Sequence, residues 1–188
     1  HPRMIPSHQP CILLLALLLA SLCAAQEQPD FSFQLGRYGT LGFGYGLPYG
    51  GYGFSADMYI FDQLALTVDA GTLLYAAGYE LGIKYLHGNA GKLWRPQAIL
   101  LYGVNGIIPY NFSNTEVVQT EVYNGFTAGL GSQFMFGKKR RHGLDFGVTY
   151  VISSGLFKRL EELAGYELGA SSRFGFYLGY RYAFQFLY

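Results

Sequence analysis

Residues 174–188 alternate between two kinds of side chain. Every even-numbered position from Phe174 to Tyr188 is aromatic or leucine, whereas the odd-numbered positions are mostly small or polar. Successive side chains of a β-strand point to opposite faces, so this pattern predicts a strand with one apolar, aromatic face. A helix would place its apolar residues every three or four positions instead. The alternation therefore restricts this part of the chain to β-structure that borders an apolar environment.

The same alternation of apolar with small or polar residues recurs upstream. In 144–153, for example, Leu144 and Phe146 alternate with Asp145 and Gly147. Each segment is close to the roughly 9 to 11 residues that a tilted membrane strand requires. The predicted strands are 35–45, 52–60, 64–74, 79–86, 94–104, 125–137, 144–153 and 174–188. We therefore predict an all-β fold, namely an eight-stranded antiparallel up-and-down transmembrane β-barrel.

Glycine and aromatic residues are abundant in a chain with little charge. The 188 residues include 26 Gly, 17 Tyr and 15 Phe, and only 13% are charged. Most Tyr and Phe fall on the parity that would face lipid, and much of the Gly falls on the inward parity, where a narrow barrel has little space. A soluble β-sandwich would carry many outward charges, and a Gly- and Tyr-rich secreted structural protein is the other alternative. The near balance of 13 Lys and Arg against 12 Asp and Glu argues against a nucleic-acid partner and against disorder.

The N-terminal segment has the layout of a secretory signal peptide. An apolar run at 12–19 is followed by small residues that end at Ala25, after which the sequence becomes polar. The run is shorter than the roughly 20 residues of a membrane-spanning helix. We expect a signal peptide over 1–25, a barrel domain over 26–188, and a start codon at Met4 or upstream. Both cysteines precede the expected cleavage site, so the exported domain would contain no disulfide.

The connections between the predicted strands are of two kinds. With the N-terminus in the periplasm, three short polar connections would be periplasmic turns, and the two longest connections, 106–121 and 154–172, would be outward loops. Leucines at helical spacing predict a short helix at 156–164 inside the last loop. The short turns are 62–63, 87–91 and 138–142.

The last strand carries a more specific motif. Tyr177 and Gly179 are followed by the alternating aromatics Tyr182 and Phe184, and the sequence ends on Tyr188. This pattern is similar to the assembly signal of bacterial outer-membrane barrels. With the signal peptide and the eight segments, the chain resembles the outer membrane protein beta-barrel domain family of small Gram-negative barrels. The resemblance implies a porin-like protein of the bacterial outer membrane that contacts outer-membrane lipid and is inserted by the barrel assembly machinery.

Eight charged residues are predicted to point into the lumen. An unpaired charge inside a narrow barrel is unfavourable, so mutual ion pairs are the structural interpretation. The functional alternative is a thin polar conduit or a small-ligand site. Four of these residues are acidic and four are basic. They are Asp57, Asp69, Glu80, Lys84, Arg95, Asp145, Arg173 and Arg181.

The sequence offers no set of residues that fits an enzyme, a cofactor or a metal site. After the signal segment the only histidines are His87 and His142, and both fall in predicted periplasmic turns. Barrel enzymes that deacylate lipid A use a His and a Ser two residues apart on one strand as base and nucleophile. Neither histidine of this chain has a Ser at that spacing. Two distant histidines without a cysteine do not make a typical zinc site. We expect no catalysis, cofactor or metal, and a lipid A-modifying enzyme is the least favoured alternative.

Two classes of function remain open. The first is an integral outer-membrane barrel with a structural role, or with a role in binding an extracellular partner through 106–121 and 154–172. The second is a narrow conduit or binder for small hydrophobic molecules or ions, for which Tyr177 on the inward parity is the only hint. Barrels with eight strands have interiors that side chains fill, so the sequence favours the first class.

Overall fold

The computed structural model describes residues 38–73, 76–89, 92–111, 118–137, 139–162 and 173–185. The predicted signal peptide at 1–25 and the terminal Tyr188 lie outside these residues.

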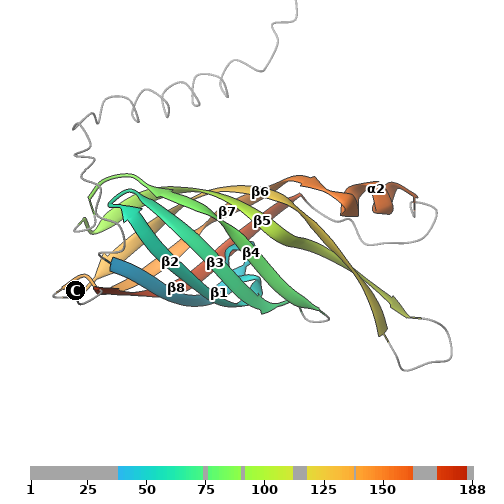
Figure 1. The fold of residues 1–188 in the computed structure, drawn as a ribbon, viewed down its shortest axis with the longest axis horizontal. Helices are drawn as coiled ribbons and strands as arrows, with labels where there is room; N and C mark the ends of the chain where they lie inside the picture. The colour runs from blue at the N-terminus through green and yellow to red at the C-terminus, as the bar shows by residue number, and fades with distance from the viewer. Residues whose placement is uncertain are drawn as a thin grey trace, which may run out of the picture. The chain divides into compact units, whose positions relative to one another are not determined.

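Eight strands form one closed antiparallel barrel (Figure 1). Each strand pairs with its neighbours in the sequence, and the first strand pairs with the last, so the barrel closes and confirms the predicted fold class. The strands are β1 (Tyr38–Gly46), β2 (Gly51–Phe61), β3 (Leu64–Thr72), β4 (Ala77–Leu86), β5 (Trp94–Asn111), β6 (Val118–Phe136), β7 (His142–Ser154) and β8 (Phe174–Gln185).

The pairing keeps side chains of like parity on the same face of the barrel. Where β1 meets β8, Leu41 pairs with Tyr182 and both are exposed on the outside. One position further, Gly42 pairs with Arg181, which is fully buried inside. Directly opposite residues of an antiparallel pair share a face, so the period-two patterns of the strands combine into an apolar outer surface and a small or polar interior.

The two ends of the barrel differ, and we name them by their connections. The turn end carries the β2–β3, β4–β5 and β6–β7 connections, and the loop end carries the other four. Two short helices lie in loop-end connections: η1 (Leu47–Tyr49) between β1 and β2, and α2 (Gly155–Glu162) between β7 and β8, close to the helix predicted at 156–164. In the described part of the chain, none of the helices is long and apolar enough to cross a membrane.

Strands β5 and β6 are much longer than the sequence predicts, with 18 and 19 residues. Most of the expected loop at 106–121 is strand, because the two strands remain paired out to Asn111 and Val118. A register shift between Val104 and Gly106 marks a β-bulge, and Val104 and the residue after it are both buried. A bulge moves the side-chain alternation by one position and interrupts the periodic pattern, which is why the predicted loop is wrong.

Candidate functional site in the barrel lumen

A network of ion pairs joins four strands inside the lumen. The Arg181 guanidinium on β8 lies between two carboxylates, with Nη1 2.6 Å from Asp57 Oδ2 and Nε 2.5 Å from Asp145 Oδ2. Lys84 Nζ on β4 lies 3.0 Å from the same Asp57 carboxylate. All four side chains are at most 1% exposed. Two cations therefore neutralise two carboxylates away from water, as buried charges require.

Two hydroxyl groups complete the hydrogen bonding around Arg181. Arg181 Nη2 donates to Ser55 Oγ at 3.0 Å, so Nε, Nη1 and Nη2 of the guanidinium all have acceptors. Thr40 Oγ1 donates to Asp57 Oδ2 at 2.8 Å. Both hydroxyls come from inward positions of β1 and β2. Because hydrogen bonds satisfy the charged groups, the network is expected to hold the lumen in one conformation.

Tyr49 from η1 packs against this network inside the barrel. Its side chain is 0% exposed, and its hydroxyl donates to Asp145 Oδ2 at 3.1 Å. The Arg181 guanidinium lies 5.4 Å from the centroid of its ring. Gln97 Nε2 also donates to the Asp145 carboxylate and, at 2.9 Å, to the Tyr177 hydroxyl. The loop between β1 and β2 therefore supplies a side chain that fills the lumen.

Inward-facing glycines provide the space for two buried tyrosines. A Cβ at Gly179 would overlap the Tyr49 hydroxyl, and a Cβ at Gly44 would lie 2.9 Å from the same ring. A Cβ at Gly131 would overlap the Tyr177 hydroxyl. Sequence reasoning missed Tyr49 because it lies in a connection, outside the period-two pattern. The inward glycines were the feature of the sequence that could have indicated it, because they leave space in the lumen for a large side chain from another element.

Asp69 and Glu80 have a different environment from the other acidic lumen residues. They pair across β3 and β4, and they are 1% and 0% exposed. Thr67 Oγ1 donates to Asp69 Oδ1 at 3.2 Å. Asp69 Oδ2 and both Glu80 oxygens have no hydrogen-bond partner among the residues that the structure describes. The ion pairing that the sequence suggested for the lumen charges therefore does not extend to these two.

This difference predicts opposite effects for the same chemical change at two carboxylates. Glu80→Gln is expected to raise the free energy of unfolding by about 1–3 kcal/mol, because the native protein must either bury this carboxylate without a cation beside it or protonate it, and the amide requires neither. Asp57→Asn is the matched control and is expected to lower it by at least about 1 kcal/mol, because Arg181 and Lys84 lose their shared anion. Urea unfolding in detergent micelles measures both values. A loss of stability in both variants would contradict the assignment.

Two of the arginines that were predicted to pair with carboxylates in the lumen, Arg173 and Arg95, are placed differently. Arg173 is exposed, and its guanidinium lies 4.3 Å from the ring centroid of Phe157 on α2, so the prediction that it points into the lumen is wrong. Its position has inward parity, but β8 begins only at Phe174. Arg95 is buried in the lumen, yet its Nη2 donates to the backbone carbonyl of Asp62 rather than to a carboxylate.

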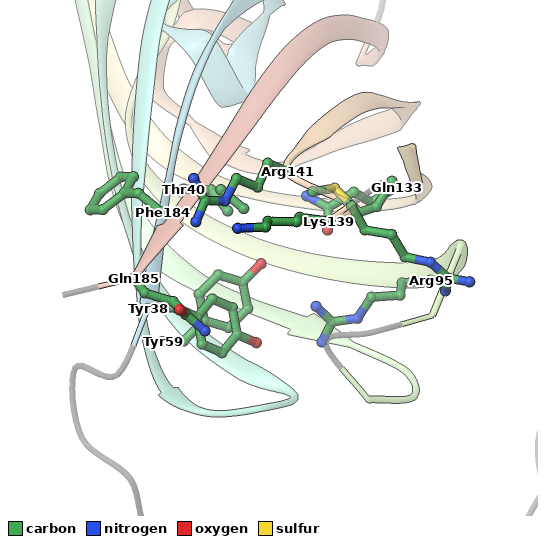
Figure 2. Close-up of a pocket in the computed structure, with 12 residues that line it drawn as sticks. Tyr38, Thr40, Tyr59, Arg95, Gln133, Lys139, Arg141, Phe184 and Gln185 are labelled. Atoms are coloured by element: carbon green, nitrogen blue, oxygen red, sulfur yellow. The ribbon is translucent and has the colours of Figure 1, made fainter. Parts of the chain in front are cut away.

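The lumen contains a cavity of about 480 Å³ at the turn end (Figure 2). Arg95, Gln133 and Tyr59 line it from the strand ends, and Lys139 and Arg141 line it from the β6–β7 turn. The cavity is therefore lined by several basic side chains. It adjoins the Arg181 network through Thr40, which lines the cavity and donates to Asp57.

The residues of the predicted assembly signal occupy both faces of β8. Tyr177 is 2% exposed inside the barrel, and Gly179 is also inside, against Tyr49. Tyr182 is exposed on the outer surface, and Phe184 lines the turn-end cavity. Their role in assembly stays a prediction.

Both histidines lie at the turn end, where the sequence places them. His87 follows β4, and His142 is the first residue of β7, where its Nδ1 shares a hydrogen bond with the Tyr180 hydroxyl. Within the described residues, no group of three or more His, Cys, Asp or Glu side chains is placed to hold a metal ion.

A closed eight-stranded barrel with an apolar outer surface and a filled, polar interior has the architecture of small transmembrane β-barrels. Comparison with solved structures finds this fold in the crystal structure of the N-terminal beta-barrel domain of Pseudomonas aeruginosa OprF. The TM-score is 0.51 at 15% sequence identity, and the match covers 80% of this chain and 100% of that one. No family model matches the sequence, and no curated protein matches it significantly. The likeness therefore concerns the fold.

Proposed function

We propose that this protein is an integral barrel of the bacterial outer membrane, with a closed lumen and a structural or loop-mediated interaction role. The observation that carries the proposal is the outer surface of the barrel, where large apolar side chains from every strand are exposed. They include Leu41, Phe43, Phe54, Met58, Leu66, Val68, Leu81, Ile83, Leu100, Tyr102, Phe126, Leu130, Phe146, Val148, Phe176 and Leu178.

Exposure of this apolar barrel surface to water would be unfavourable. Monomeric soluble proteins rarely expose a contiguous apolar patch of more than a few hundred Å². Here Phe54 is 73% exposed, Leu130 67% and Phe176 65%, on three different strands of one closed barrel. The hydrocarbon of a lipid bilayer favours such an apolar surface. The closed barrel is also compatible with hydrocarbon, because closure leaves no unpaired strand edge.

The filled lumen supports a structural role over a conduit. Arg181, Tyr49 and Tyr177 are large side chains that are at most 2% exposed. Arg181 and Tyr49 both donate to Asp145 of β7, and Gln97 of β5 donates to Asp145 and to Tyr177. A solute that passed through the lumen would have to break these ion pairs and hydrogen bonds. The second class of function, a narrow conduit, is therefore less favoured by the geometry.

The loop end supports a role in binding a partner. β5 and β6 have 18 and 19 residues, whereas the other strands have 9 to 13, and in Figure 1 the β5–β6 hairpin projects past the ends of β3 and β4. At the β7–β8 connection, Leu156 of α2 is buried over Gly106 of β5, where a Cβ would overlap the leucine. This helix is thus packed onto the projecting strands and extends the surface that they offer.

Three measurements test the proposal: membrane fractionation, heat-dependent gel migration and conductance in planar bilayers. The protein is expected in the outer-membrane fraction, with a shift in gel migration between unheated and heated samples, because closed barrels resist unfolding in detergent at room temperature. In planar bilayers the folded protein is expected to show no conductance above leak, because the Arg181 network and Tyr49 fill the lumen. Release of the protein in soluble form would contradict the membrane location, and steady conductance well above leak would favour the conduit.

A further inference from the structure

The turn-end cavity differs from the rest of the lumen in its charge. Its described lining includes Arg95, Lys139 and Arg141, and no described lining residue is an aspartate or glutamate. Elsewhere in the lumen, the cations Arg181 and Lys84 face carboxylates. The cavity therefore brings basic side chains together, and its described lining contains no carboxylate. Figure 2 shows the side chains of Arg95, Lys139 and Arg141 on opposite walls of this space.

Two contacts hold the Arg95 guanidinium in place, and its Nε takes part in neither of them. Its Nη2 donates to the Asp62 carbonyl, which also accepts a 3.0 Å hydrogen bond from the Tyr38 hydroxyl. Its guanidinium carbon lies 5.7 Å from the ring centroid of Tyr59, which is itself stacked on Tyr38 at 4.2 Å. Its Nε has no hydrogen-bond partner among the described residues, although the side chain is only 2% exposed. The guanidinium is thus preorganised, with a buried donor still to be satisfied.

Two further buried donors line the same cavity. Gln133 Nε2 and the Tyr59 hydroxyl also lack hydrogen-bond partners in the described structure, and both side chains are 1% exposed. An unsatisfied buried donor is unfavourable by about 1–3 kcal/mol, so each such group needs an explanation. Three such donors around one cavity, together with the rim cations Lys139 and Arg141, are a set that suits an anion with several acceptor oxygens.

We propose that the turn-end cavity is a binding site for the phosphate group of a small organic phosphate. A phosphate presents several acceptor oxygens and up to two negative charges, which match the three donors and the cationic rim better than a single carboxylate does. The volume of about 480 Å³ is far larger than a bare phosphate and lies within the range of small-molecule sites. Met135 adds an apolar wall on which a glycerol or sugar moiety can pack.

The orientation of the barrel decides where the phosphate comes from. This step rests on the proposed function and on the orientation expected from the sequence, in which the short turns lie in the periplasm, beside the inner leaflet of the outer membrane. Two sources share the same chemistry there: the headgroup of an anionic phospholipid and a soluble phosphate ester. The cavity would hold the phosphate in both cases, and only the attached group would differ.

The test uses the folded mature chain in dodecylmaltoside micelles, in a buffer without phosphate. Titration calorimetry with glycerol 3-phosphate forms one arm, and native mass spectrometry with micelles doped with short-chain phosphatidylglycerol or phosphatidylcholine forms the other. We expect saturable binding at or below about 1 mM in at least one arm, and weakening by salt, because the contacts are charged. Tighter binding of the phosphatidylglycerol than of glycerol 3-phosphate identifies the lipid as the source, and the reverse order identifies the soluble ester.

Three variants assign the binding to the cavity. Arg95→Gln is expected to weaken binding at least about tenfold, because it removes the preorganised guanidinium. The rim double variant Lys139→Gln/Arg141→Gln changes two exposed side chains and is expected to weaken binding several-fold while the barrel folds normally. Lys158→Gln, an exposed cation on α2 at the opposite end, is the matched control and should leave binding unchanged.

The folded state of each variant is checked by heat-modifiable migration, so the rim variant decides the question if Arg95→Gln does not fold. Absence of saturable binding by the wild-type barrel in both arms up to about 10 mM would overturn the proposal. Binding that neither Arg95→Gln nor the rim variant weakens would overturn it as well. These outcomes are separate from failure of the proposed function, which would appear as a chain that forms no barrel in membranes.

Discussion

Replacing Arg181 by glutamine is expected to lower the free energy of unfolding by about 3–5 kcal/mol, because it leaves buried carboxylates without their cation. Arg181 is the group that pairs with Asp57 and Asp145 at the same time. After the substitution Asp57 would retain Lys84, but no ion pair would remain to Asp145 among the described residues. A neutral amide could replace some hydrogen bonds but not the charge. The loss should therefore exceed that of any other single charge removal in the lumen.

The measurement is urea unfolding in detergent micelles, followed by the fluorescence of Trp94. This residue is the only tryptophan of the chain, and it is 54% exposed on the outer surface, so its emission changes when the apolar surroundings are lost. Arg173→Gln is the matched control, because it removes an exposed arginine just before the same strand. Its effect should stay within about 1 kcal/mol, the value of the exposed cation–π contact with Phe157 that it removes. A loss of less than about 1 kcal/mol in the Arg181 variant would show that the network does not stabilise the barrel.

Tyr49→Ala is expected to lower the free energy of unfolding by about 3–5 kcal/mol, because truncating a fully buried aromatic side chain leaves a cavity. Gly179→Ala alone is expected to lower it by about 1–3 kcal/mol, because the added methyl group would overlap the Tyr49 hydroxyl. In the double variant the methyl group occupies part of the space that the tyrosine vacates. The combined loss should therefore be smaller than the sum of the two single losses by about 1 kcal/mol or more.

Gly175→Ala provides the control for this cycle. It lies on the same strand with the same parity as Gly179, but a Cβ there would meet only the hydroxyl of Thr149. That side chain can rotate away, so the effect should be small and independent of Tyr49. The same urea unfolding experiment measures the three single variants and the two double variants that combine Tyr49→Ala with Gly179→Ala or with Gly175→Ala. Additive losses for Tyr49→Ala and Gly179→Ala would mean that Tyr49 does not occupy the space beside Gly179.

The sequence predicted the placement of side chains well wherever the strand alternation continued. Leu41 and Tyr182 are outside and Asp57, Lys84 and Arg181 are inside, as their parity requires. It failed where the alternation is interrupted or has no strand to follow. The bulge after Val104 interrupts the alternation, so the extension of β5 was not predicted. Arg173 has the parity of an inward residue, but it precedes the first residue of β8.

The candidate sites depend on contacts that no local pattern encodes. Arg181 and Asp57 are 124 residues apart in the sequence, and Tyr49 and Asp145 are 96 apart. Their meeting depends on the closure of β1 against β8 and on the register of every strand pair between them. The turn-end cavity likewise combines Arg95 with Gln133 and the β6–β7 turn, which meet only in the closed barrel.

The sequence by itself determined that the chain forms β-strands, how many there are and the face on which most side chains lie, because a period of two is a local property of an extended chain. Only the tertiary structure decided which inward charges pair, that Tyr49 fills the lumen, that Asp69 and Glu80 face each other with no ion pair among the described residues, and that basic side chains gather at one end. The physical reason is that these contacts depend on barrel closure and strand register, which place residues of distant strands at the same height in one narrow interior.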